Sequence, residues 1–151
     1  MENNMDSRAE TYKHIQEVGR LISIVIQNLL KRMAEHDKTK LEAPEVELFD
    51  KFTPLLVGVT YNSDEYKKFL EELKPALDHH YAKNRHHPES FQNGIKDMNL
   101  VDILEMLCDW NAASKRHNDG NIRKSIAINQ QRFGYSDELK QILINTLVLF
   151  E

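Results

Sequence analysis

Four of the chain's seven histidines stand within nine positions, in the stretch HHYAKNRHHPE over residues 79–89. They are His79, His80, His86 and His87. Neutral imidazole is the commonest protein ligand for transition metals, and carboxylates complete such sites. Because Pro88 disfavours the helical conformation for His87, we expect the second pair in a loop after a helix that carries the first pair. The rings would then meet around a metal ion; the alternative is two unconnected pairs in solvent.

A further histidine stands beside a carboxylate far away in the sequence, at His36 and Asp37 in the stretch EHDKTK over residues 35–40. This pair, with Lys40 three residues on, resembles the HD superfamily of metal-dependent phosphohydrolases, in which the His-Asp pair supplies two ligands to one metal. The stretch CDWNAASKR over residues 108–116 is similar to the last Asp-containing helix of that superfamily. The resemblance implies that His36, Asp37 and Asp109 are metal ligands and that Lys40 neutralises the transferred phosphate.

The order of these groups resembles the HD-GYP branch most, but the GYP tripeptide is absent, so a cyclic-dinucleotide substrate is not implied. Over nearly its full length the chain also resembles a small uncharacterised family of tailed phages and bacteria. Three blocks carry this second resemblance: HDKTKLEAPE, HHYAKNRHHPE and EMLCDWNAA. That family implies little biochemistry, so the expectation of phosphohydrolase activity depends on the HD resemblance.

HD enzymes usually have a histidine upstream of the His-Asp pair, and His14 is the residue in that place here. His14 and His36 are 22 residues apart on a helix that the pattern predicts to be unbroken. That separation is about 33 Å along the axis, whereas a metal-nitrogen bond is about 2.0–2.1 Å. We therefore expect that His14 is not a ligand unless the helix breaks near residues 27–28.

Three carboxylates, Asp102, Glu105 and Asp109, follow the spacing i, i+3, i+7 and share one face of a predicted helix. Asn99 would be the N-cap of this helix, and Asp102 then occupies the N3 place of a capping motif, which is the alternative to a catalytic role. Glu105 has no such local role and is expected to hold a ligating histidine by its second ring nitrogen. The predicted catalytic set is Lys40, Glu105 and Asp102.

The expected substrate is a small phosphorylated molecule, with a nucleotide as the first choice. Guanidinium groups match phosphate bidentately, although each arginine is alternatively a surface residue. The predicted substrate-binding residues are Arg85, Arg116, Asn129 and Arg132. A mixed His/Asp ligand set favours Mn, Fe, Co, Ni or Zn over Mg, as one ion or two.

Composition describes an ordinary globular protein of 151 residues with 40% hydrophobic and 29% charged residues. The net charge of −4 argues against extended binding to nucleic acid. The single cysteine, Cys108, rules out an internal disulfide and fits a reducing cytoplasm, that of the host if the protein is phage-encoded. No stretch has the apolar length of a membrane span, so we expect no membrane partner. A homo-oligomer is left open.

Apolar periodicity predicts helices throughout and only weak strand signals. Helices are expected over about 8–33, 46–52, from Ser63 to about 81, from Asn99 onward, over 122–133 and over 136–149, with 53–62 extended or irregular. The expected fold is one all-α, HD-domain-like helical bundle over residues 1–151, with irregular loops carrying the site and residues 1–7 flexible.

The predicted function is a metal-dependent phosphohydrolase, either a phosphomonoesterase or a phosphodiesterase, acting on a nucleotide or similar phosphate ester. One alternative is a non-enzymatic protein that binds a metal or a nucleotide. Another is a phosphodiesterase or sequestering protein for a cyclic nucleotide that counters host signalling. A third has no metal at all and uses the histidines in a polar core.

Overall fold

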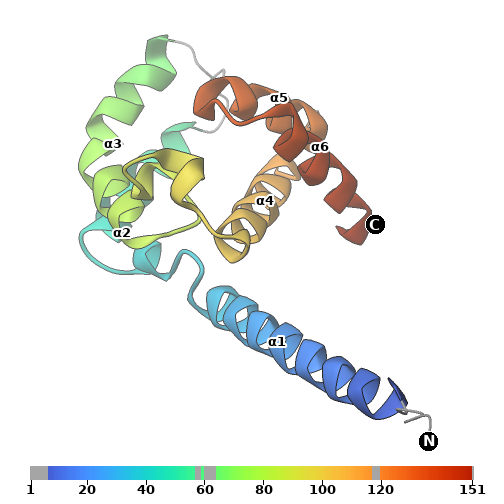
Figure 1. Ribbon diagram of the computed structural model, residues 1–151. Coiled ribbons are helices and arrows are strands. Elements are labelled where there is room, and N and C mark those ends of the chain that lie inside the picture. Colours follow the sequence, from blue (N-terminus) through green and yellow to red (C-terminus); the bar gives the residue numbers. More distant parts are fainter. Residues whose placement is uncertain (1–6, 57–58, 60–63, 117–119, 151) are drawn as a thin grey trace, which may run out of the picture. The chain divides into compact units, whose positions relative to one another are not determined.

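The structure, a computed structural model, describes residues 7–56, 59, 64–116 and 120–150. Within these ranges it contains six α-helices and short 3-10 helices without a strand, which confirms the all-α prediction (Figure 1). The chain divides into two compact units, one up to Glu35 and one from His36 onward. The expected flexible segment falls on residues 1–6, outside the described residues, and on Ser7, which begins the first helix.

Helix α1, Ser7–Glu35, makes up the described part of the first unit. It runs for 29 residues without interruption and contains no buried residue. The break considered near residues 27–28 does not occur, since α1 is continuous there. The Asn28 side chain donates a hydrogen bond to the Ile24 carbonyl one turn back. His14 is exposed on this helix, about 30 Å along the axis from Glu35.

Helices α2, Glu45–Leu56, and α3, Asp64–Lys83, pack against each other in the second unit (Figure 1). Phe52, Leu73 and Ala76 form their buried contact. The prediction of irregular structure over 53–62 is wrong at its start, since α2 continues through Pro54 to Leu56. A proline removes one backbone hydrogen bond, and we attribute the persistence of the helix to the packing of Phe52, which is 1% exposed. Residues 57–58 and 60–63, with the predicted cap Ser63, lie outside the described residues.

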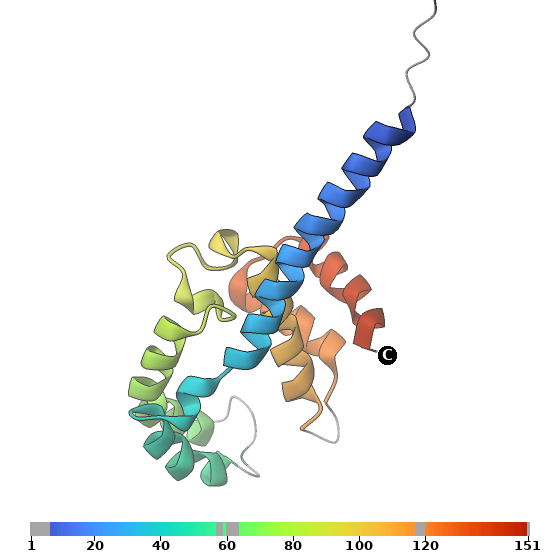
Figure 2. The ribbon, with the colours of Figure 1, turned by 90° about the horizontal axis from the view of Figure 1, so that it is seen from below.

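Helices α4, Leu100–Ser114, α5, Ile122–Phe133, and α6, Asp137–Thr146, build a second hydrophobic cluster. Figures 1 and 2 show these helices on the opposite side of the second unit from α2 and α3. The predicted caps are confirmed at Asn99 and Ser136, whose side chains accept backbone N–H groups of the first turn. Helix α6 ends earlier than predicted, because Leu147–Phe150 tighten into a 3-10 helix.

The segment between α3 and α4 links the α2–α3 pair to the cluster of α4, α5 and α6. It contains two 3-10 turns, Pro88–Ser90 and Gly94–Asp97, and Ile95 and Met98 enter the second cluster. The Ser90 hydroxyl donates to the carbonyls of Tyr81 and Asn84, which ties the segment to the end of α3. His86 and His87 are thereby held in a fixed, non-helical connection, as the position of Pro88 predicts.

Candidate metal centre

Three separate elements bring four ligand atoms together, which we call the deep group. Asp37 precedes the 3-10 helix Lys38–Leu41, His80 lies on α3, and His86 and His87 follow α3. The His80 Nε2 atom is 3.2 Å from Asp37 Oδ1 and 3.0 Å from His87 Nε2. The His86 Nε2 atom is 3.4 Å from the same Asp37 oxygen.

The spacing within the deep group fits ligands that share one ion. Ligand atoms about 2.0–2.1 Å from a metal lie about 3.0 Å apart at right angles and about 3.4 Å apart at tetrahedral angles. Asp37 Oδ1 and both ring nitrogens of His86 are also buried without a hydrogen bond, although most buried polar atoms have one. A cation would give Asp37 Oδ1 and His86 Nε2 a partner, with His86 releasing a proton as it binds, and the residues present fit a divalent transition metal.

A second set of ligand atoms, the outer group, uses the other side of the same aspartate. It consists of His36 Nε2, Asp37 Oδ2 and Asp109 Oδ1. The His36 nitrogen is 3.7 Å from the Asp37 oxygen and 3.8 Å from the Asp109 oxygen. The outer group is thus wider than the deep group and shares a carboxylate with it.

Asp37 reaches both groups from an unusual backbone conformation. Its φ of 55° and ψ of 12° lie in the left-handed region, at the N-cap of the 3-10 helix. Aspartate and asparagine enter this region more readily than other residues with a side chain. The Lys40 backbone N–H donates to the Asp37 carbonyl at 2.9 Å, which fixes the turn that places the Asp37 carboxylate.

Glu105 on α4 orients two of the histidine rings. Its Oε1 atom accepts a hydrogen bond from His36 Nδ1 at 3.0 Å and lies 3.2 Å from His86 Nδ1. A carboxylate beside Nδ1 favours the form of the ring that binds a metal through Nε2, as in the carboxylate–histidine pairs that support metal-bound histidines. This geometry is the one expected for Glu105 as a support for a ligating histidine.

Glu45, which the sequence analysis did not single out, has the same role on the other side. It is fully buried at the start of α2 and accepts from His79 Nδ1 at 2.7 Å and from His80 Nδ1 at 2.9 Å. The Thr39 hydroxyl donates to Glu45 at 3.0 Å, and Asn84 donates to that hydroxyl at 2.9 Å. The signal for Glu45 was its place in the HDKTKLEAPE block, next to the histidine-aspartate pair.

His79 differs from the role predicted for it as a ligand. Its Nδ1 atom contacts Glu45, and His79 belongs to none of the ligand groups among the described residues. Neighbouring residues on a helix project about 100° apart, so only one of the two can face the deep group. That residue is His80, which is 1% exposed.

Electrostatics prepares the deep group for a cation. Burial alone would raise the pKa of the Asp37 carboxyl, but contacts with two histidine rings and the Lys40 ammonium hold it well below its usual range. Burial likewise favours neutral His86, yet Asp37 and Glu105 outweigh burial and raise the pKa of His86 to about 9. Burial, together with neighbouring positive groups, lowers the pKa of His87 to about 2. His87 is therefore neutral at neutral pH, and its Nε2 atom shares a hydrogen bond with His80 Nε2.

Lys40 stands at the solvent side of the centre. Its Nζ atom is 2.6 Å from Asp37 Oδ2 and 5.5 Å from the centre of the Phe49 ring. The side chain is 35% exposed, so the ammonium faces both the carboxylate and solvent. Such a place suits the predicted contact with a phosphate.

Asp102, predicted to be catalytic, has a structural role at the start of α4. It is fully buried, accepts from the Asn99 backbone N–H at 3.0 Å and completes the capping box of α4. Arg85 donates to both Asp102 oxygens, at 3.1 and 2.8 Å. The capping role that the sequence offered as the alternative for Asp102 is present, and capping and the Arg85 pair use both of its oxygens.

The predicted substrate-binding residues are not drawn into the centre. Arg85 pairs with Asp102, and Arg132 donates to Glu89 at 2.6 Å. Arg116 is exposed just after α4, and Asn129 is half-buried on α5. The pairing of Arg85 and Arg132 argues against their predicted role, because their guanidinium groups already bind carboxylates.

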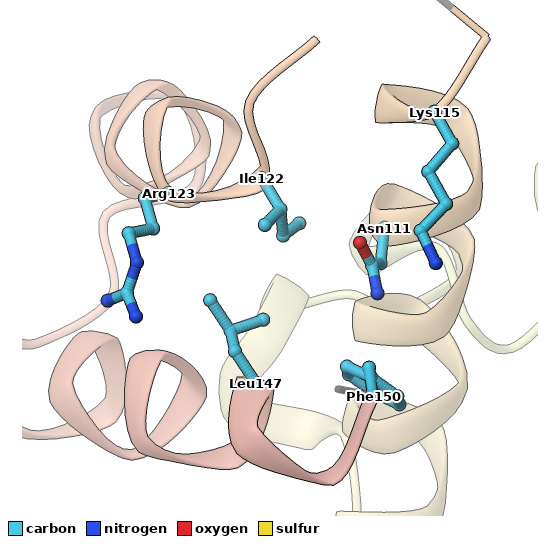
Figure 3. A pocket seen from close by; sticks show the side chains of 6 residues that line it. All are labelled: Asn111, Lys115, Ile122, Arg123, Leu147 and Phe150. Carbon is cyan, nitrogen blue, oxygen red and sulfur yellow. The ribbon is translucent and has the colours of Figure 1, made fainter.

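A separate pocket lies between α4, α5 and the C-terminal 3-10 helix (Figure 3). Its lining is Asn111, Lys115, Ile122, Arg123, Leu147 and Phe150. The lining contains no histidine and no carboxylate, so this pocket is not part of the metal centre.

An all-helical fold with buried histidine-carboxylate groups able to hold a metal ion defines the class of this protein. A family model matches residues 3–149, and the chain belongs to that family, described as a family of unknown function (DUF5662). Membership agrees with the resemblance to an uncharacterised family. Comparison with curated proteins and with solved structures finds no match. No helix in the described ranges is both long and apolar enough to cross a membrane.

Proposed function

We propose that the protein is a metal-dependent phosphohydrolase that acts on a nucleotide or a similar small phosphate ester. The observation that carries the proposal is the deep group, in which three histidine nitrogens and one carboxylate oxygen lie within 4.8 Å of one another and two of these atoms, Asp37 Oδ1 and His86 Nε2, have no hydrogen bond. The Lys40 ammonium beside this group supports an anionic substrate. The resemblance of the His36-Asp37 pair to the HD superfamily supports the same reaction class.

The chain's own residues divide the work of hydrolysis. A divalent ion in the deep group would polarise a phosphoryl oxygen and activate water. Lys40 would neutralise a second phosphoryl oxygen. His36 Nε2, on a ring that Glu105 orients through Nδ1, would take the proton of the attacking water as the water oxygen bonds to phosphorus and the ester bond breaks. The leaving oxygen would then gain a proton from solvent.

Purified protein loaded separately with Mn²⁺, Fe²⁺, Co²⁺, Ni²⁺ or Zn²⁺ tests the proposal against mono-, tri- and cyclic nucleotides. We expect metal-dependent release of phosphate or of a ring-opened nucleotide from at least one compound, and loss of that release in Asp37→Asn. An Asp50→Asn variant is the matched control, since Asp50 is an exposed aspartate on α2. If none of the five metals supports hydrolysis of any of the compounds, the proposed enzymatic activity is rejected.

A structural ion is the second candidate, favoured by the number of protein ligands. Structural zinc is four-coordinate with protein ligands only, and the deep group supplies four atoms. Ions that accept six ligands, such as Mn²⁺, would keep two positions open for water and substrate. Under this alternative, zinc raises the unfolding temperature while no phosphate ester is hydrolysed.

A further inference from the structure

The two oxygens of Asp37 have different cationic partners. Oδ1 faces the deep group, where no ammonium or guanidinium group of the described residues contacts it. Oδ2 faces the outer group and is bound by Lys40 Nζ at 2.6 Å. The carboxylate that could bridge two metal ions thus has a lysine where the second ion would bind.

We infer that the centre holds a single divalent ion, in the deep group, and that the Lys40 ammonium takes the place of a second cation at the outer group. The inference rests on the proposed metal centre and specifies its stoichiometry. It also limits His36 and Asp109 to roles other than ligation in the resting protein.

The geometry of the outer group supports a site without an ion. The separations of 3.7 and 3.8 Å between its atoms exceed the roughly 3.0–3.4 Å expected between adjacent ligands of one ion, for metal–ligand bonds of about 2.0–2.1 Å. The outer group also offers three atoms, one of them on the oxygen already bound by Lys40. The deep group, in contrast, offers four atoms, and the separations of 3.0, 3.2 and 3.4 Å between three of its atom pairs agree with the expected spacing.

Lys40 is fixed in its place by two independent contacts. Besides the ion pair with Asp37, its ammonium lies 5.5 Å from the centre of the Phe49 ring on α2. An ion bound to the same Asp37 oxygen would lie within about 5 Å of the ammonium, where like charges repel. Binding of a second ion therefore requires that Lys40 leave.

The consequence for the substrate is a mixed cationic pair. A phosphate group would contact one metal ion and one ammonium, rather than two metal ions. The Lys40 ammonium carries a single positive charge and donates hydrogen bonds. The centre therefore suits a phosphate group whose oxygens accept hydrogen bonds from Lys40.

Counting ions by equilibrium dialysis against excess Mn²⁺ and elemental analysis tests the inference without any activity measurement. We expect one ion per chain in the wild type and in Lys40→Arg, which keeps the charge. Lys40→Met should bind two, and electron paramagnetic resonance should then show exchange coupling between two Mn²⁺ ions that share Asp37. Lys38→Met, a change at an exposed lysine of the same turn, should bind one.

Lys40→Gln is the second variant in case methionine disturbs the fold, with helical content by circular dichroism as the check. Two ions per chain in the wild type would overturn the inference, as would one ion in correctly folded Lys40→Met and Lys40→Gln. No ion in the wild type would overturn the metal centre itself. One ion without hydrolysis of any ester would reject the proposed reaction and leave this inference standing.

Discussion

The deep and outer groups of the centre share Asp37 but differ in their access to solvent. His80 and His86 are each 1% exposed, whereas the side chains of His36 and Asp109 are 31% and 27% exposed. The deep rings are fixed by Glu45 and Glu105, and the outer atoms lie farther apart beside a partly exposed lysine. The difference separates two tasks: a buried, oriented set can select and hold an ion, while an open set can meet a substrate.

The largest effect is expected from removing one of the ligands of the deep group. His87→Ala should weaken binding of Mn²⁺ or Zn²⁺ by more than about 100-fold, because loss of a ligand exceeds the roughly 10–100-fold effect of outer-shell changes. Titration against a competing chelator measures the affinity. His14→Ala is the control and should bind metal as the wild type does; a parallel loss in both variants would contradict the assignment of the deep group.

A smaller loss is expected when the support behind a ligand changes. Glu45→Gln keeps the volume but weakens the acceptor for His80 Nδ1, so metal affinity should fall by about 10–100-fold. Glu47→Gln, at an exposed position on the same helix, should have no effect. Equal affinities of the two variants would show that the deep rings need no fixed tautomer.

The pH should act on metal binding through His86. Its raised pKa of about 9 means that the metal-free ring carries a proton below pH 9, and ligation must release that proton. Affinity should therefore rise with pH, by about tenfold per unit between pH 7 and 8, and level off above about pH 9. Chelator competition across this range measures the slope, and an affinity independent of pH would exclude His86 as a ligand.

The smallest effect on the centre is expected at Asp102. Asp102→Ala removes the capping box of α4 and the partner of Arg85, so the free energy of unfolding should fall by about 1–3 kcal/mol. Metal affinity in the folded variant should stay that of the wild type. Denaturant unfolding measures the change in stability, and chelator titration measures the change in metal affinity. A loss of metal affinity without a loss of stability would show that Asp102 takes part in the metal centre.

The helices were predictable where their starts or their extent depend on residues close together in the sequence. Asn99 and Ser136 mark helix starts with their own side chains, and α1 follows from its apolar spacing. The end of α2 was not predictable from local signals, since Pro54 argues for an interruption. The burial of Phe52 against α3 is a contact between elements that sequence periodicity does not describe.

The ligand-bearing blocks were also found in the sequence, because histidine and aspartate are conspicuous by type. The choice between His79 and His80 depends on how α3 is rotated against α2, which no local pattern specifies. Glu45 was missed for a related reason, since its partners come from α3 and it looks like an ordinary first-turn carboxylate. Asp102 was placed in the catalytic set although its capping role was recognised.

The left-handed backbone of Asp37 narrows the evolutionary routes open to the centre. Glutamate and cysteine are both metal ligands, yet each would meet a cost of roughly 1–2 kcal/mol in this conformation. Glycine and asparagine accept the backbone, but glycine has no ligand atom and asparagine has no charge. A protein that keeps this turn can therefore replace Asp37 at low backbone cost only by losing the carboxylate that would bind the metal. The histidines around it can be replaced without this backbone cost.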